Sequence, residues 1–271
     1  MVLMLGFLFV TTSTSFGARQ DEQFGKVKGT NVVTQGEAGP VKENICKNPK
    51  LCESLEIDLL DSLQKSKIPA VVPKAKAAKS EAGYQVALNL GAVVSDGLAA
   101  VIGKNKGAVL KIAAILNKDG KKLGISQDIL TKYHKEITAL AHKGEWTKLE
   151  TTLYEFKDKM TTELNDQNKK DEASLAMVSG SLEGLYILVK SVDKKFSQEG
   201  ANLLQDKAMG PYLEKYMNSL SEAVKDKSEV KAITAALPKI DNIIDKPKNY
   251  DFTKKDLKDL LAILKPLHKG M

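Results

Sequence analysis

Two acidic residues stand alone in long apolar stretches of this sequence. Asp96 is the single charge in residues 83–103, and Glu183 is the single charge in residues 173–189. A carboxylate on an apolar helix loses its water when the helix packs, and this loss is costly unless a partner compensates it. One expectation is therefore a polar pocket between two helices, where a raised carboxylate pKa suits a ligand contact or proton transfer. The other expectation is that structural hydrogen bonds satisfy both acids, which is the commoner case in folded proteins.

Both stretches also carry small residues about one helical turn apart. Glycine and serine let two helix backbones approach closely, because they place little or no side chain at the contact. We therefore predict that the two stretches are helices that pack against each other. The positions expected at this contact are Gly91, Ser95, Gly97, Gly180 and Gly184.

The remaining motifs do not complete a catalytic or metal site. Residues 97–105 resemble a phosphate-binding loop, but the glycines are one residue too far apart and Asn105 replaces the required Ser or Thr. His134 and His142 lie eight residues apart, which is roughly 12 Å along a helix and too far to share a metal ion. The sequence therefore predicts no catalytic residues, no metal site and no cofactor.

The rest of the chain is patterned for amphipathic helices. Apolar residues recur every three to four positions, and no segment alternates convincingly at period two, so no sheet is expected. Ser126 and the pair of Thr253 and Asp256 are expected to cap helices, and Pro238 is expected to bend or split one. The predicted fold is an all-α bundle of about seven to nine helices around two central apolar helices.

The N-terminus is typical of an exported protein. Residues 2–10 form an apolar run too short to span a bilayer, and Ser15 and Gly17 supply the small residues that favour cleavage after Gly17. A buried N-terminal helix is the alternative. Cys46 and Cys52 are separated by five residues. In an oxidising periplasmic or extracellular compartment, this spacing predicts a small disulfide loop.

Composition divides the chain into three parts. Residues 1–17 are the predicted signal peptide, and residues 80–271 the predicted helical bundle. Residues 18–79 between them hold a disordered polar segment, the cysteine loop, an amphipathic helix and a linker rich in Pro and Lys. A membrane span over residues 83–103 is disfavoured, because Asp96 near its centre costs about 2.5 to 3.5 kcal/mol on insertion scales.

The net charge is +7, from 41 basic and 34 acidic residues. This excess favours contact with an anionic surface, although no specific signal for nucleic acid is present. The basic segments are residues 67–79 and a C-terminal group of Lys254, Lys255, Lys258, Lys265 and Lys269.

The order of these elements resembles uncharacterised exported all-α proteins of environmental bacteria. The features that carry the resemblance are the glycines flanking Asp96 in residues 91–97, the run Lys-Gly-Glu-Trp at residues 143–146, and the glycines of residues 180–184. The resemblance covers about residues 80–225. It implies an exported helical protein and brings no activity with it.

Three functions are open at this point. The first is a non-enzymatic exported helical protein with a binding or structural role, whose partner is an anionic envelope surface or another protein. The second is a small-molecule binder or enzyme that uses a polar pocket at Asp96 and Glu183. The third is a binder of polyanions or of the envelope surface through the basic segments. One open pocket shared by both acids would favour the second, and separate salt bridges the first.

Overall fold

The computed structural model describes residue 60, residues 62–63 and residues 65–271. Every regular element in this part is a helix, so the predicted all-α bundle is confirmed. Eight of the ten helices found there are long, whereas α9 and α11 are about one turn each. The helices are α4 (Gly83–Ile102), α5 (Lys106–Leu123), α6 (Gln127–Lys143), α7 (Trp146–Asp166), α8 (Lys170–Lys194), α9 (Gln198–Asn202), α10 (Met209–Asn218), α11 (Glu222–Lys225), α12 (Ser228–Ile244) and α13 (Lys254–Gly270).

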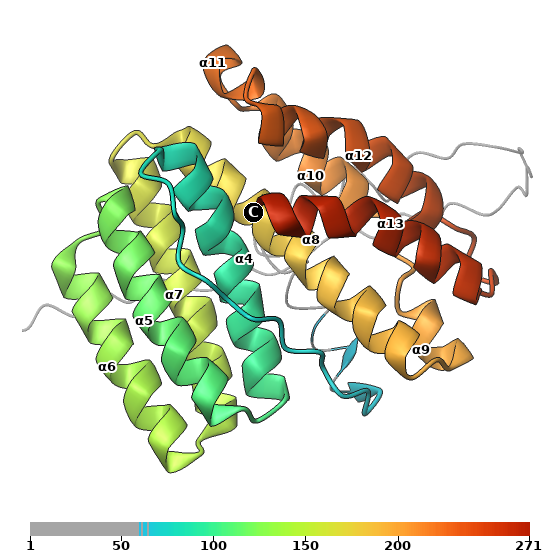
Figure 1. Cartoon of the computed structure of the whole chain (residues 1–271), viewed down its shortest axis with the longest axis horizontal. Helices are drawn as coiled ribbons and strands as arrows, with labels where there is room; N and C mark the ends of the chain where they lie inside the picture. Colours follow the sequence, from blue (N-terminus) through green and yellow to red (C-terminus); the bar gives the residue numbers. More distant parts are fainter. Residues whose placement is uncertain (1–59, 61, 64) are drawn as a thin grey trace, which may run out of the picture. The chain divides into compact units, whose positions relative to one another are not determined.

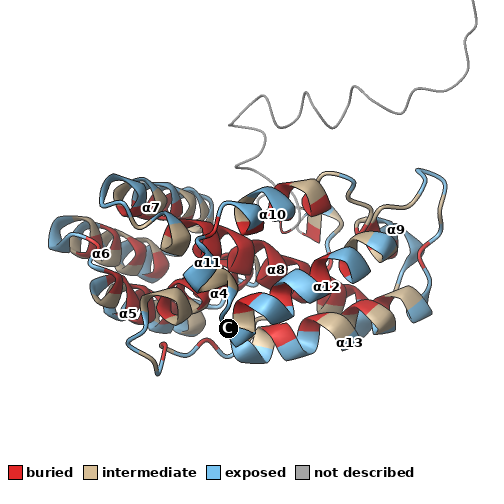
Figure 2. Cartoon of the chain, turned by 90° about the horizontal axis from the view of Figure 1, so that it is seen from above, coloured by how far each residue is buried: buried red, intermediate tan, exposed pale blue. Residues whose placement is uncertain are grey.

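Helices α4 and α8 form the centre of this bundle (Figure 1). Their mutual contact is the most extensive one between described helices; α5 and α7 also pack on α4, and α7, α10 and α13 on α8. Figure 2 shows both central helices as largely buried, while the outer helices expose one face. By length and composition α4 and α8 could cross a membrane, yet 83% and 94% of their most apolar windows are buried by the fold. This burial accounts for their apolar composition.

Helix α4 approaches α8 closely at Gly91. A Cβ atom added at Gly91 would collide with the carbonyl oxygen of Ala176, so only glycine fits there without displacing the backbone. One turn further along α4, the Ser95 hydroxyl donates a hydrogen bond of 2.9 Å to the carbonyl oxygen of Gly180. Three of the five small residues predicted at the contact therefore lie where the two helices meet.

The other two small residues have different neighbours. A Cβ atom at Gly97 would lie 3.2 Å from Ile112 of α5 and 3.4 Å from Leu153 of α7. Gly184 is buried, but a Cβ atom there would meet nothing within 4 Å. Gly97 therefore brings α4 close to α5 and α7, while the space beside Gly184 could hold a small side chain.

Local sequence signals set several helix boundaries. Thr253 and Asp256 form a capping box at the start of α13, as predicted. Ser126 precedes α6 as expected, but its hydroxyl donates to Glu163 of α7 instead of capping the helix. Pro238 lies inside α12 and does not split it. The buried apolar face of α12 compensates for the one backbone hydrogen bond that proline removes.

An extended segment, residues 68–81, precedes α4 and is called the strap below (Figure 1). It contains most of the residues predicted as a linker, and it lies along the bundle. The backbone N–H of Val71 donates to the hydroxyl of Ser191 on α8 at 2.8 Å. The side-chain amide of Asn89 on α4 donates to the carbonyl oxygen of Lys76 at 3.0 Å. Both central helices thus hold the strap in place.

The predicted signal peptide of residues 1–17 lies outside the described residues, and so do Cys46 and Cys52. Signal cleavage, export and the disulfide loop therefore stay predictions.

Candidate functional site

A cavity of about 460 Å³ opens between the strap and the helices α4, α8 and α13. Asp96 of α4 and Glu183 of α8 both line it, together with His268 of α13. Gln85 and Asn89 of α4 add two side-chain amides to its lining. The two acids singled out by the sequence therefore share one cavity.

Asp96 and Glu183 are almost completely buried and face each other. Their exposed fractions are 5% and 1%, and the Glu183 carboxylate lies close enough to Asp96 to affect its titration. Burial raises the pKa of Asp96 to about 9, and the charge of the nearby Glu183 carboxylate adds to the shift. Near neutral pH Asp96 therefore keeps its proton.

Each acid has one oxygen without a hydrogen-bond partner. Asp96 Oδ1 and Glu183 Oε1 are buried and contact no donor in the described part of the chain. An unsatisfied buried polar atom costs about 1 to 3 kcal/mol, and more when the group is charged. Two such atoms from facing residues in one cavity are the strongest sign of a ligand site in the described structure.

His268 is the third ionisable group beside the pair. Its Nδ1 lies 2.7 Å from Glu183 Oε2, so the ring nitrogen donates to the carboxylate. The ring stacks on Tyr186 of α8, with centroids 4.3 Å apart and planes 19° apart. Lys190 donates to the Tyr186 hydroxyl at 3.2 Å. The imidazole is thus fixed on two sides while 29% of its side chain stays exposed.

Sequence reasoning assigned no role to His268. The apolar periodicity of α13 could have indicated that His268 faces the bundle. The buried residues of this helix include Leu260, Leu264 and Leu267. His268 follows Leu264 by four positions and therefore lies on the same face of the helix. Its partner Glu183 is 85 positions away in the sequence, and no local pattern reveals that pairing.

Asp119 of α5 holds the strap over the cavity. It is fully buried, and its Oδ2 accepts from the backbone N–H of Ala78 at 2.9 Å and from Asn89 at 2.8 Å. Lys122 donates to the carbonyl oxygens of Ala78 and Ser80, each at 3.0 Å. Burial raises the pKa of Asp119, although these donors and the nearby lysines act in the opposite direction. These contacts position the part of the strap that lines the cavity.

Lysine side chains line the outer part of the cavity. Lys74, Lys76 and Lys79 come from the strap and Lys269 comes from α13, and all four residues are exposed. Parts of both predicted basic segments therefore converge on one cavity, although binding to polyanions stays a prediction. No cluster suited to a metal ion occurs among the described residues. The cavity thus has an acidic interior and a basic outer part.

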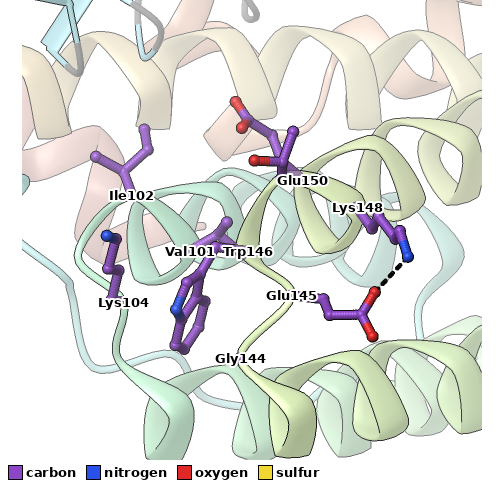
Figure 3. A pocket seen from close by; sticks show the side chains of 9 residues that line it. Val101, Ile102, Lys104, Gly144, Glu145, Trp146, Lys148 and Glu150 are labelled. Atoms are coloured by element: carbon purple, nitrogen blue, oxygen red, sulfur yellow. Dashed lines mark ion pairs between the residues drawn. The ribbon is translucent and has the colours of Figure 1, made fainter.

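A second cavity, of about 420 Å³, lies where the end of α4 meets the turn between α6 and α7 (Figure 3). Trp146 and an ion pair of 2.5 Å between Lys148 and Glu145 line it. None of its charged side chains is buried. Unlike the first cavity, this one has no buried polar atom without a partner among its lining residues.

No protein-family model, curated protein or solved structure matches the chain. The chemistry of the cavity beside Asp96 and Glu183 is therefore the basis for a function. That chemistry consists of two facing buried acids, one histidine and a basic outer part.

Proposed function

We propose that this protein is an exported helical protein that binds a small polar molecule, without catalysis, in the cavity beside Asp96 and Glu183. One observation carries the proposal: two buried carboxyl groups that face each other each keep an oxygen without a donor. A bound molecule that donates hydrogen bonds would satisfy both oxygens. Binding alone achieves this, and no covalent step is needed.

The size and lining of the cavity support the same function. Its volume of about 460 Å³ is in the range of about 300 to 1,000 Å³ that is usual for small-molecule sites. Its polar groups are held by other contacts, since His268 stacks on Tyr186 and Asn89 bonds to Asp119. A site fixed in advance loses little conformational entropy when a ligand binds.

Export is supported by the apolar run of residues 2–10 and the small residues before Ala18. Intact-mass measurement of the secreted protein should give a chain that starts at or near Ala18. Recovery of the full-length chain from the cytoplasm would argue against this part of the proposal.

A thermal-shift screen of the purified protein against small polar molecules tests the binding function. A ligand present at 100 times its Kd stabilises the folded state by about 2.7 kcal/mol, which gives a clear rise in Tm. The rise should disappear in Glu183→Gln and persist in Glu145→Gln, a matched change in the second cavity. A ligand whose effect survives both Glu183→Gln and Asp96→Asn would place binding elsewhere and overturn the proposal.

A further inference from the structure

We infer that the molecule bound in this cavity is a small zwitterion, with its ammonium group between Asp96 Oδ1 and Glu183 Oε1 and its anionic group beside the lysines of the outer part. This ligand class rests on the proposed function and specifies the chemistry of the same site. Two opposite charges at two depths of one cavity are the observation that points to it.

The interior of the cavity favours an ammonium group. Asp96 Oδ1 and Glu183 Oε1 are acceptors without donors, and an ammonium group supplies three N–H donors from one atom. A hydroxyl or an amide could donate to the same oxygens, but only a cation also compensates a buried carboxylate charge. A free carboxylate ligand would be repelled from this depth by Glu183.

The outer part of the cavity disfavours a simple amine. Lys74, Lys76, Lys79 and Lys269 line it, and a ligand whose only charge is positive must pass these side chains. Repulsion by like charges costs a cationic ligand more binding free energy than exposed ion pairs contribute to a ligand with an anionic group. The lysines therefore act mainly on selectivity, and the buried contacts with the ammonium group provide most of the affinity.

A bound ammonium group competes with the proton that Asp96 keeps. Because burial and the Glu183 charge raise the pKa of Asp96 to about 9, cation binding near neutral pH expels that proton. Affinity for a zwitterion should then rise with pH, by up to about tenfold per unit, between pH 6 and 8.5. A primary ammonium group stays charged over this range.

Other ionisable groups also line the cavity. They are Glu183 on α8, His268 and Lys269 on α13, and Lys74, Lys76 and Lys79 on the strap. His268 Nδ1 lies 2.7 Å from Glu183 Oε2, and the four lysines are exposed, so the predicted pH dependence is assigned to Asp96.

Isothermal titration calorimetry with matched probes tests the ligand class. The zwitterions are glycine, β-alanine and 4-aminobutyrate; propylamine, propionate and propionamide are cationic, anionic and neutral controls of similar size. At least one zwitterion should bind at least tenfold more tightly than all three controls. Glu183→Gln should weaken it at least tenfold, Asp96→Asn should abolish the rise of affinity with pH, and Glu145→Gln should change neither. Replacing Lys79 and Lys269 together by Ala should reduce the preference over propylamine.

The outcomes separate this inference from the function on which it rests. If propionamide or another neutral donor binds best and loses affinity in Glu183→Gln, the cavity is a binding site and the zwitterion assignment is overturned. A zwitterion that binds with no dependence on pH, or equally well in Glu183→Gln and Asp96→Asn, also overturns it. If no probe binds, the assignment fails, and the wider thermal-shift screen decides the proposed function. Circular dichroism of each variant shows that it is folded.

Discussion

His268 Nδ1, on the last helix, lies 2.7 Å from Oε2 of Glu183, a buried acid near the middle of α8. This hydrogen bond joins α13 to the centre of the bundle and satisfies one of the two Glu183 oxygens. The other oxygen, Oε1, is left without a donor beside the cavity. One contact therefore contributes both to the packing of α13 and to the shape of the site.

Replacing His268 by Ala should destabilise the protein. Glu183 would lose its donor while remaining buried, which costs about 1.5 to 3 kcal/mol for a hydrogen bond to a charged group. Unfolding by urea, followed by the fluorescence of Trp146, the single tryptophan of the chain, measures the change. His142→Ala, an exposed change on α6, is the control. Equal stability of the two variants would show that the contact between His268 and Glu183 adds nothing.

Asp96 should make the stability of the protein depend on pH. Its pKa is about 9 in the folded state, against an ordinary value of 3.8. Between these values the folded chain holds a proton that the unfolded chain has released. This group therefore lowers stability by up to about 1.4 kcal/mol for each unit of rising pH.

Asp96→Asn should remove that dependence, because the amide has nearly the same shape as the carboxyl group and does not titrate. The Tm of the variant, relative to the natural protein, should rise steadily from pH 5 to pH 9. Asp128→Asn, at an exposed position on α6, should show no such trend. Parallel Tm profiles for Asp96→Asn and the natural protein would contradict the raised pKa.

The sequence predicted the two central helices and their acids because burial leaves a local signal. A single charge in about twenty apolar residues is a property of one segment, and it identified Asp96 and Glu183 without any knowledge of the fold. Whether such acids meet depends on how two distant segments pack. Only the structure therefore shows that Asp96 faces Glu183. It also shows that His268 of α13 contacts Glu183.

The same limit applies to the small residues and to the strap. Spacing showed that small residues recur on α4 and α8, but it could not show that Gly97 faces α5 or that Gly184 has open space beside it. Proline and lysine correctly indicated an extended segment before α4. The contacts of that segment come from Asp119 and Asn89, two polar residues on separate helices, and no sequence spacing links them.

Alanine at the two central glycines should have opposite effects. At Gly91 the new Cβ would collide with the carbonyl oxygen of Ala176, a backbone atom that cannot move alone. Gly91→Ala should therefore cost about 1 to 3 kcal/mol. Gly184→Ala is the matched control, since its Cβ would meet nothing within 4 Å. Alanine favours a helix over glycine by up to about 1 kcal/mol, so this variant should be neutral or more stable. Equal losses in urea unfolding would contradict the close contact at Gly91.

Removal of Asp119 should release the strap while leaving the bundle folded. Its Oδ2 accepts from the backbone of Ala78 and from Asn89, and Asn89 in turn donates to the carbonyl oxygen of Lys76. In Asp119→Ala these groups lose their common acceptor, so the strap should open more often to solvent. Limited digestion with trypsin measures this opening, because the strap carries Lys74, Lys76 and Lys79.

Cleavage in the strap should become at least tenfold faster in Asp119→Ala, with helical circular dichroism largely retained. The exposed change Asp166→Ala, at the end of α7, should leave the rate unchanged. Because Asp119 does not line the cavity while the strap does, ligand binding in Asp119→Ala should weaken through the loss of that wall. Unchanged cleavage in Asp119→Ala would mean that Lys122, which donates to Ala78 and Ser80, is sufficient to hold the strap. The double variant with Lys122→Ala would then be needed to open the wall of the cavity.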